Sequence, residues 1–407
     1  MLPNVPRLRR IMADRGVDVI VATSPENVTY LGEYFCGTQW RNKGTQAYAV
    51  VAVDDTIAPF LAIPAIEIDP WAENPSWITD VRPYGTFYRE LAEIDAKTKP
   101  DDERIIKLAR STATEANAVK TLAAVLTEKG LSSANLAVDE TGVFPSLWQA
   151  IKDSLPHARI TDGSGILRST RMVKTPAELD RLAHAARVNE EAFAMAIKSM
   201  VPGATHRELV HLYTSEITRR GGMPYAASIS TGLWSGHVHP NVSDQVLRDG
   251  DLVKSDTACT VNHYWADTAR TKAVTTANEE QCKIYEALLA GEQAAIKSIR
   301  PGIFASEVFQ TAVETIRASG LPGYKRTHCG HGIGVSIYDP PLIQARERVS
   351  DIANLGRTET VLEAGMVFCV ETPYYVVGKW GMTVEDTVVV EARGTRVLTS
   401  LDRGLSR

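Results

Sequence analysis

The chain has 407 residues, more than one ordinary domain holds, so two domains are expected. Its hydrophobic fraction of 44% and charged fraction of 23% are those of a globular protein with a large core. A formal net charge of −5 argues against a general nucleic-acid binder, which needs a basic face. There is no apolar run of the roughly 18 residues that a membrane span needs. Without a secretory signal or paired cysteines, the chain is expected to be cytoplasmic.

The first part of the chain, residues 1–165, reads as a smaller α/β domain. Apolar strands are predicted over 17–22 and 47–53, with helical segments around them. A new pattern begins at Thr175–Glu178, where threonine, proline and glutamate form a capping box that opens a long amphipathic helix. We therefore expect a second, larger domain over residues 166–407.

One loop of the first domain combines residues that suit ligand contact. Residues 36–44 carry Trp40 and Arg41 between glycines. A loop of this composition is usually just solvated, and the alternative is that Trp40 and Arg41 bind substrate. Both interpretations stay open at this point.

The second domain repeats a pattern and predicts an internal duplication. Helices are expected to begin at 203–208 and at 302–307, and they end near Gly221 and Gly320. Each is followed by a strand and then by a hairpin that carries two acidic residues. This order predicts two similar α/β halves that face each other, without the fixed short period of a solenoid.

The first acidic hairpin spans residues 250–271. Asp256 and Asp267 are equidistant from Val261-Asn262, so a turn there would place the two aspartates directly opposite each other. Residues opposed in this way have Cβ atoms roughly 4.5–5.5 Å apart. Two carboxylates at that separation repel each other, so a positive group is expected between them. A pair of metal ions fits this requirement.

The second acidic hairpin repeats the arrangement with glutamates. Glu371 and Glu385 are equidistant from Gly378, a plausible turn residue. Between the two hairpins lies His331, in a glycine-rich segment where backbones can approach closely.

Together the four carboxylates and the imidazole form an oxygen-rich ligand set. Such a set suits two divalent ions such as Mn²⁺, Co²⁺ or Fe²⁺ better than a thiolate zinc site. Two bridging carboxylates would hold the ions about 3.5–4 Å apart, a spacing that activates a shared water for attack. The alternative is four surface acids and a core histidine. For any one residue that alternative is favoured, but five residues with matched symmetry argue for the metal site.

These residues carry a resemblance to a known family. Their order and motifs resemble the pita-bread metallopeptidases, which include aminopeptidase P, prolidase, methionine aminopeptidase and creatinase. The matching motifs are Asp-x₁₀-Asp closing in Thr-Ala-Arg-Thr, Gly-His-Gly-Ile-Gly, Gly-Met-Val before Glu371, and Val-Glu-Asp at 384–386. The resemblance covers about residues 165–395. It implies a C-terminal pita-bread fold of the α/β (α+β) class behind an N-terminal creatinase-type α/β domain.

The resemblance also implies a role for each ligand. Asp256 would chelate one ion, while His331 and Glu371 would bind the other. Asp267 and Glu385 would bridge the two. Glu371 would in addition carry protons to and from the bridging water. Manganese is the expected metal, with cobalt, iron or zinc as alternatives.

On the substrate side, the residues that the resemblance implies differ in part from those of the peptidases. His239 stands where aminopeptidase P and prolidase have a histidine that stabilises the oxyanion or the leaving group. His237 would share its face if the segment is a strand, as a substrate-binding neighbour. Tyr338 replaces a second histidine, and Thr383 replaces an arginine of the peptidases. Tyr338 and Asp339 are therefore candidate acid–base residues.

Three functions follow from these residues. The first is a metal-dependent hydrolase that cleaves a peptide or amide C–N bond, like an Xaa-Pro aminopeptidase or dipeptidase. The second is a non-peptidase member that acts on a small zwitterionic metabolite, like creatinase, ectoine hydrolase or a dimethylsulfoniopropionate lyase. The third, a binding protein without catalysis, ranks last because all five ligands are present. The resemblance further implies a homodimer in which Trp40 and Arg41 of one chain reach the active site of the other.

Overall fold

The computed structural model describes residues 1–42, 44–111, 115–347 and 359–406. The chain divides into two compact units, Met1–Arg171 and Met172–Arg407. The division falls after helix α8 (Ser164–Arg171), a few residues beyond the boundary expected at 165/166. Side-chain contacts explain why α8 stays with the first unit. Arg7 Nε donates to the Ser169 carbonyl at 3.0 Å, and Arg171 Nη1 donates to Asn27 Oδ1 at 2.6 Å.

The first unit is built on a six-stranded mixed sheet in the order β4-β3-β2-β1-β5-β6. Its strands are β1 (Val19–Ala22), β2 (Tyr48–Ala52), β3 (Phe60–Pro64), β4 (Asp80–Tyr84), β5 (Asn135–Val138) and β6 (Arg159–Asp162). Its helices before α8 are α1 (Val5–Asp14), α2 (Pro25–Gly32), α3 (Gly37–Arg41), α4 (Ile68–Glu73), α5 (Pro100–Arg110), α6 (Ala118–Glu128) and α7 (Pro145–Ser154). Strands β1, β2 and β3 are buried along their whole length, which explains why they read as continuous apolar runs.

A buried carboxylate ties β5 to the start of α2. Asp139 is fully buried and accepts hydrogen bonds from the Ser24 backbone at 3.0 Å, from Ser24 Oγ at 2.6 Å and from Asn27 Nδ2 at 2.6 Å. Burial by itself would raise the pKa of Asp139. The bonds from Ser24, Thr141 and Asn27 outweigh burial and hold this pKa below its usual 3.8. The ionised carboxylate therefore stabilises the folded first unit.

We predict that Asp139→Asn destabilises the protein by about 2–4 kcal/mol at pH 7, because the amide presents donors to groups that are themselves donors. The pKa of Asp139 is depressed on folding, so its contribution is complete above the unfolded value of 3.8 and is lost as the pH falls through the lower folded value. Urea midpoints at pH 7 and pH 3.5 measure both effects. Asp54→Asn, at an exposed turn, is the control and should change little. Equal midpoints for wild type and Asp139→Asn at pH 7 would contradict the prediction.

The second unit contains an eight-stranded sheet in the order β11-β10-β12-β15-β9-β8-β7, with β16 paired to β15. Its strands are β7 (Met223–Thr231), β8 (Leu252–Val261), β9 (Tyr264–Ala273), β10 (His328–Gly332), β11 (Asp339–Gln344), β12 (Val367–Glu371), β15 (Glu385–Val390) and β16 (Thr395–Val397). A small two-stranded sheet joins β13 (Tyr374–Val376) to β14 (Trp380–Met382). Its α-helices are α9 (Pro176–Lys198), α10 (His206–Arg219), α11 (Glu279–Ser298) and α12 (Ala305–Ala318). No helix in the described part of the chain is both long enough and apolar enough to cross a bilayer.

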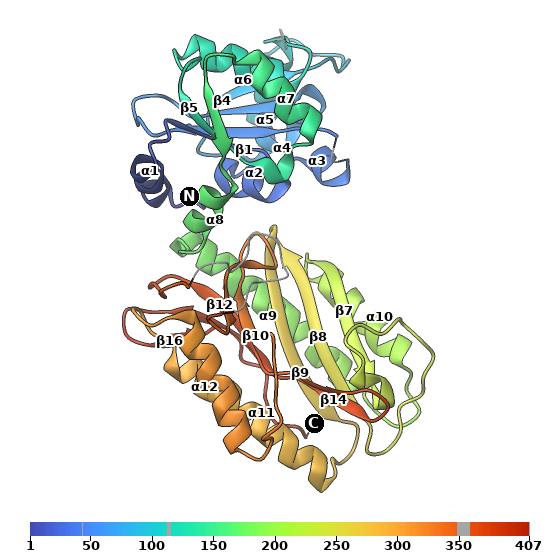
Figure 1. The fold of residues 1–407 in the computed structure, drawn as a ribbon. Helices are drawn as coiled ribbons and strands as arrows, with labels where there is room; N and C mark the ends of the chain where they lie inside the picture. Colours follow the sequence, from blue (N-terminus) through green and yellow to red (C-terminus); the bar gives the residue numbers. More distant parts are fainter. Residues whose placement is uncertain (43, 112–114, 348–358, 407) are drawn as a thin grey trace. The chain divides into compact units, whose positions relative to one another are not determined.

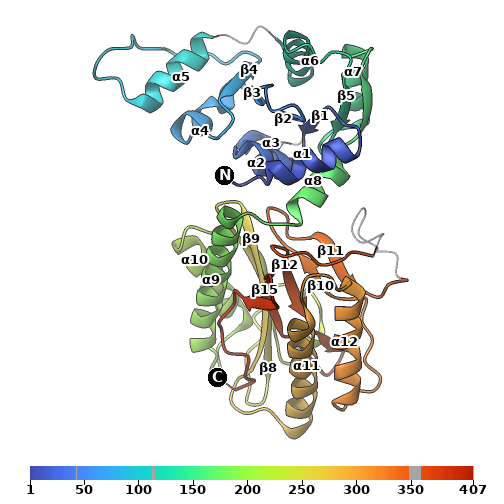
Figure 2. The same cartoon turned by 90° about the vertical axis from the view of Figure 1, so that its left-hand side faces the viewer.

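The predicted duplication is visible in the element order of this unit (Figure 1). Helices α9 and α10 precede β7, β8 and β9, and helices α11 and α12 precede β10, β12 and β15. Each helix pair packs on the strands of its own half through a separate apolar core. Figure 2 shows the two helix pairs beside their strands, α9 and α10 in green and α11 and α12 in orange. The two halves join in the middle of the sheet, where Glu385 of β15 pairs with Ala269 of β9.

Helix starts were predicted correctly where a capping box marks them. Thr175 and Glu178 cap α9, and Thr205 and Glu208 cap α10, with side chain and backbone bonded in both directions. These caps fix where each helix begins, and so fix how its apolar face meets the sheet.

Candidate metal centre

Five neighbouring strands each contribute one of the predicted ligands. In sheet order these strands are β10, β12, β15, β9 and β8. They carry, in that order, His331, Glu371, Glu385, Asp267 and Asp256. Residues far apart in the sequence therefore become neighbours because their strands are neighbours. The structure brings all five predicted ligands together.

The predicted register of the first hairpin is wrong by two residues. The turn is Asn262-His263, with φ of 48° and 67°, and Val261 pairs with Tyr264. Asp256 consequently pairs with Ala269, and Asp267 pairs with Ala258, so the two aspartates lie diagonally rather than directly opposite. The turn cannot include Val261 because a β-branched residue strongly disfavours positive φ. Both aspartates still project from one face, since a shift of two residues preserves the face.

The predicted register of the second hairpin is confirmed. Glu371 of β12 pairs directly with Glu385 of β15. The same register continues into the small sheet, where Val376 pairs with Trp380 around Gly378. Gly378 has φ of 83°, a conformation that favours glycine, so the turn lies where the sequence placed it.

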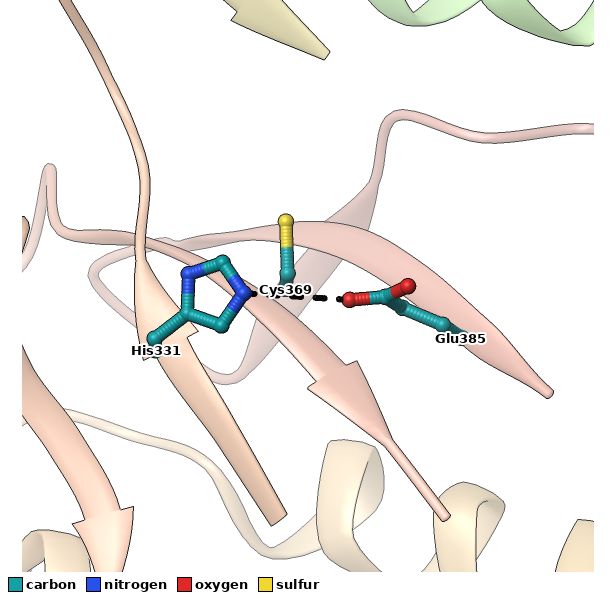
Figure 3. Close-up of side chains that lie close together, drawn as sticks. All are labelled: His331, Cys369 and Glu385. Atoms are coloured by element: carbon teal, nitrogen blue, oxygen red, sulfur yellow. Dashed lines mark ion pairs between the residues drawn. The ribbon is translucent and has the colours of Figure 1, made fainter. Parts of the chain in front are cut away.

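The ligand atoms lie close enough to share metal ions. One carboxylate oxygen from each of Asp256, Asp267 and Glu385 lies within 4.8 Å of the others. His331 Nε2 is 3.7 Å from Asp267 Oδ2 and 4.0 Å from Glu385 Oε1. Figure 3 shows the His331 ring and the Glu385 carboxylate directed toward each other, with Cys369 between their strands.

Cys369 borders this cluster but is a poor ligand. Its Sγ lies within 4.8 Å of ligand atoms of His331 and Glu385. Burial, and then the charges of Glu385 and Asp267, raises the pKa of the thiol well above its usual value. The protonated thiol donates to the Asp267 carbonyl at 3.6 Å, so Cys369 packs beside the site.

Burial and mutual repulsion together set the electrostatics of the cluster. Burial comes first, and neighbouring carboxylates second, in raising the pKa of Asp256, and the pKa values of Asp267 and Glu385 rise well above their usual range. Burial lowers the pKa of His331 to about 4, which leaves the neutral imidazole that binds metals. Four crowded carboxylates and one neutral imidazole fit a pair of hard divalent cations.

Glu371 behaves differently from the other three acids. Burial would raise its pKa, but Arg326 and then His328 outweigh burial and lower the pKa to about 2. Arg326 Nη2 is 3.1 Å from Glu371 Oε2, and His328 Nε2 is 3.0 Å from Glu371 Oε1. Glu371 is therefore ionised near neutral pH, and it is the one acid of the four whose pKa is lowered.

Sequence reasoning missed Arg326 and His328. In a regular strand His328 and His331, three residues apart, face opposite sides of the sheet. The pairing of β10 with β11 is irregular between these two histidines, and Gly330 between them has φ of 151°. This bulge turns both imidazoles toward the carboxylates. The His-x-x-His spacing and the glycine were the available signals, and Arg326 gave none.

The two candidate acid–base residues, Tyr338 and Asp339, have different surroundings. Asp339 begins β11, and Tyr338 comes directly before it. The Tyr338 ring stacks on the His331 ring with 3.8 Å between centroids and 16° between planes. Burial, followed by the charge of Glu371, raises the pKa of the Tyr338 phenol, so it remains protonated. Asp339 instead faces Lys174, whose Nζ is 3.7 Å from Asp339 Oδ2, and both side chains are buried. Tyr338 lies at the cluster, and Asp339 lies in a separate ion pair.

The two histidines of the substrate side lie in an irregular loop. His237 and His239 follow the 3₁₀ turn η3 (Gly232–Gly236), and both are exposed. Residues 237–239 do not form a strand, so the condition under which the two histidines would share a face is not met. The His237 ring stacks on Trp234, and its carbonyl accepts from Lys254 Nζ at 2.5 Å. His239 is close enough to Asp256 to favour the ionised form of that carboxyl, which lowers the Asp256 pKa against the effect of burial.

Trp40 and Arg41 belong to the first unit and lie on the short helix α3, where a loop was predicted. The Trp40 ring stacks on Phe35 with 5.9 Å between centroids. The Arg41 side chain is 77% exposed, with Nη2 3.9 Å from Glu67 Oε1. An exposed guanidinium with one long ion pair is available for another partner.

The sequence and fold were compared with known proteins. Residues 180–392 match the model of metallopeptidase family M24, and residues 5–173 match the creatinase/prolidase N-terminal domain. An Xaa-Pro dipeptidase of Pyrococcus furiosus is 30% identical over 59% of this chain and 66% of its own length. One of Lactobacillus helveticus is 24% identical over 99% and 98%.

Solved structures agree on the fold. The Xaa-Pro dipeptidase of Bacillus anthracis superposes with a TM-score of 0.77 at 21% identity, covering 99% of this chain and 98% of that one. The dipeptidase PepE of Mycobacterium ulcerans gives 0.75 at 24% identity, covering 99% and 97%. The predicted resemblance and the predicted two-part fold are confirmed.

We predict that Mn²⁺ added to chelator-treated protein at pH 7 releases protons, because Asp267 and Glu385 have raised pKa values and must ionise to bind metal. Raised folded pKa values also mean that the metal-free protein loses stability as the pH rises above the unfolded values of 3.8 and 4.5. Titration in weak buffer with a pH indicator measures the release. Glu385→Gln should release fewer protons, and the exposed control Asp244→Asn should match wild type. Metal uptake without proton release would contradict the prediction.

Proposed function

Because the chain belongs to metallopeptidase family M24, we propose that it hydrolyses the C–N bond of Xaa-Pro dipeptides with two bound divalent ions. Family membership makes it a metal-dependent hydrolase, the predicted enzyme class. One observation carries the proposal: five adjacent strands each direct one ligand-type side chain into a single buried cluster. The relatives named Xaa-Pro dipeptidase support the substrate class.

The ligand roles that we propose follow the motif positions. Asp256 would hold one ion, His331 and Glu371 the other, and Asp267 and Glu385 both, with manganese as the expected metal. When bound, such ions polarise the substrate carbonyl and lower the pKa of the attacking water. The chain's own residues then have to orient the substrate and move protons.

Proton movement is proposed for Glu371 and hydrogen-bond donation for His239 and Tyr338. The low pKa of Glu371 keeps it in the ionised form that a proton acceptor needs. The Tyr338 phenol stays protonated, so it can donate a hydrogen bond to a developing oxyanion. His239, near Asp256, is proposed to act on the oxyanion or on the leaving group.

The alternative is a small zwitterionic metabolite as substrate. Tyr338 and Thr383 stand where the peptidases have a histidine and an arginine. Neither residue carries a positive charge, and this difference favours the alternative. Thr383 is buried and its side chain carries no charge, so it cannot replace an arginine in substrate binding. Creatine, ectoine and dimethylsulfoniopropionate are the compounds to test against the dipeptides.

We further propose that the protein is a cytoplasmic homodimer in which Trp40 and Arg41 of one chain serve the site of the other. The exposed Arg41 guanidinium supports this, because bidentate guanidinium–carboxylate pairing suits a substrate with a free carboxylate.

We predict that chelated protein is inactive and that Mn²⁺ restores hydrolysis of Xaa-Pro dipeptides. Asp267→Asn should lower kcat/KM at least about 100-fold, since the metal centre contributes several kcal/mol to the transition state. Chromatography of released amino acids, with metal content measured for each sample, follows the reaction. The exposed Asp244→Asn should keep wild-type activity. Turnover of a zwitterionic metabolite but of no Xaa-Pro dipeptide would select the alternative.

Arg41→Ala should raise KM more than it lowers kcat, because the residue is proposed to bind substrate and not to take part in bond cleavage. Steady-state kinetics with a dipeptide separate the two constants. Arg110→Ala, another arginine of the first unit, is the matched control. An unchanged KM would refute the clamp role of Arg41.

A further inference from the structure

Lys254 is a buried lysine on β8, the strand that carries the predicted ligand Asp256. The two residues are two positions apart on this strand, so their side chains project from the same face of the sheet. In the described part of the chain, no acidic side chain forms an ion pair with the Lys254 amine. Burying an amine is costly unless its donors find partners, so the contacts of Lys254 indicate its role.

The amine of Lys254 contacts a backbone carbonyl and an aromatic ring. Its Nζ donates to the His237 carbonyl at 2.5 Å and lies over the Tyr375 ring, 4.3 Å from the ring centre. The charged and neutral forms of an amine both carry N–H donors, so the bond to the carbonyl does not depend on protonation. Lys254 therefore joins the ligand strand β8 to the loop of residues 237–239.

A second side chain binds the next carbonyl of the same loop. Ser228 Oγ donates to the Val238 carbonyl at 3.0 Å. Ser228 lies on β7 directly opposite Asp256, and directly opposed residues project from the same face of a sheet. Two successive carbonyls of the loop are thus bound by side chains from β7 and β8, beside the ligand Asp256.

The start of the loop is fixed separately, by close backbone packing. Turn η3, which leads into the loop, packs against the small sheet of β13 and β14 at two glycines. A Cβ on Gly236 would lie 2.5 Å from the Val376 carbonyl oxygen, and a Cβ on Gly381 would lie 2.3 Å from that of Ser235. The loop therefore leaves from a fixed point, and its further course depends on the two carbonyl contacts.

His239, at the end of this loop, has no hydrogen bond of its own within the described ranges of the chain, and its side chain is exposed. It nevertheless lies close enough to Asp256 to lower the pKa of that carboxyl against the effect of burial. The backbone contacts that precede His239 therefore determine where its imidazole lies.

We propose that Lys254 is a positioning residue that holds the loop of residues 237–239 through the His237 carbonyl and so keeps His239 beside the metal centre. This inference rests on the proposed function, because it assumes that His239 acts on the substrate. Lys254 is buried and does not touch substrate, so it acts only through His239. Placement matters because a displacement of about 1 Å can cost about 100-fold in rate.

The first test measures where His239 lies, without using activity. Protein with ¹³C-labelled histidines is loaded with Co²⁺, and each imidazole signal is compared with that of the Zn²⁺-loaded form. The paramagnetic shift decreases steeply with distance from the ion, and a His239→Gln spectrum identifies the His239 signal. In Lys254→Met this shift should decrease, because methionine has no donor for the His237 carbonyl. The shift of the ligand His331 should persist, which shows that the site is still loaded.

The second test is a double-mutant cycle on the hydrolysis of an Xaa-Pro dipeptide. Lys254→Met should lower kcat by about 10-fold or more with a smaller change in KM, because the acting group is misplaced. In a His239→Ala background, Lys254→Met should have little further effect, since the residue through which Lys254 acts is gone. Lys254→Arg keeps N–H donors and should restore part of kcat.

Lys379→Met is the matched control. Lys379 also lies over an aromatic ring, that of Trp380 at 5.3 Å, but its amine donates to Glu280 and not to the loop. The His239 shift and kcat of this variant should match wild type. If Lys254→Met does not fold, Lys254→Gln decides, because its shorter side chain stays polar but does not reach the carbonyl. A smaller His239 shift in Lys254→Gln supports the proposal, and an unchanged shift overturns it.

The outcomes separate this proposal from the proposed function. An unchanged His239 shift in Lys254→Met, or losses in kcat that add in the double variant, overturns the role of Lys254 while dipeptide hydrolysis stands. A decreased shift in a protein that hydrolyses no Xaa-Pro dipeptide overturns the proposed function and supports the positioning role of Lys254.

Discussion

Repulsion among four buried carboxylates is the constraint on which this structure depends. Asp256, Asp267, Glu371 and Glu385 project from adjacent strands of one sheet, and burial strengthens their repulsion. A fold relieves such repulsion by spreading the acids apart, protonating them or binding cations. Here the sheet holds them together through its backbone ladder and two apolar cores, so the relief has to come from protons or metal. Stability and metal binding are consequently two aspects of one energy balance.

The backbone behind the acids is fixed by buried polar contacts. The Arg270 side chain is 1% exposed and donates to the Glu385 carbonyl at 2.5 Å and to Asp386 Oδ1 at 2.6 Å. Thr387 Oγ1 donates to the Asp267 carbonyl at 3.2 Å. These bonds hold strands β9 and β15 together in the middle of the sheet, where Glu385 pairs with Ala269. Rigid ligand strands explain why repelling acids do not simply move apart.

The sequence predicted which five residues converge, because each lies in a strand of recognisable pattern and the two hairpins repeat each other. It predicted the second register correctly because Gly378 marks the turn. It failed on the first register because Asn262-His263 adopts positive φ without a glycine to signal it. Contacts between strands that are distant in sequence, such as Arg326 and His328 with Glu371, depend on a bulge in β10 that no periodicity reveals. The same limit applies to Asp139 in the first unit, whose partners Ser24 and Asn27 lie more than a hundred residues away.

The bulge at Gly330 contributes, beside Arg326, to making the four acids unequal. Without it, His328 would face away from the cluster, and Glu371 would lose one of the two partners that lower its pKa. In the described part of the chain no arginine or lysine forms an ion pair with Asp267 or Glu385, so burial and neighbouring carboxylates raise their pKa values while that of Glu371 falls. Pairs of titratable groups with opposite shifts are how a site divides acid and base roles. The division here follows in part from backbone geometry: one irregular strand supplies both the ligand His331 and His328, one of the two partners that set Glu371 apart.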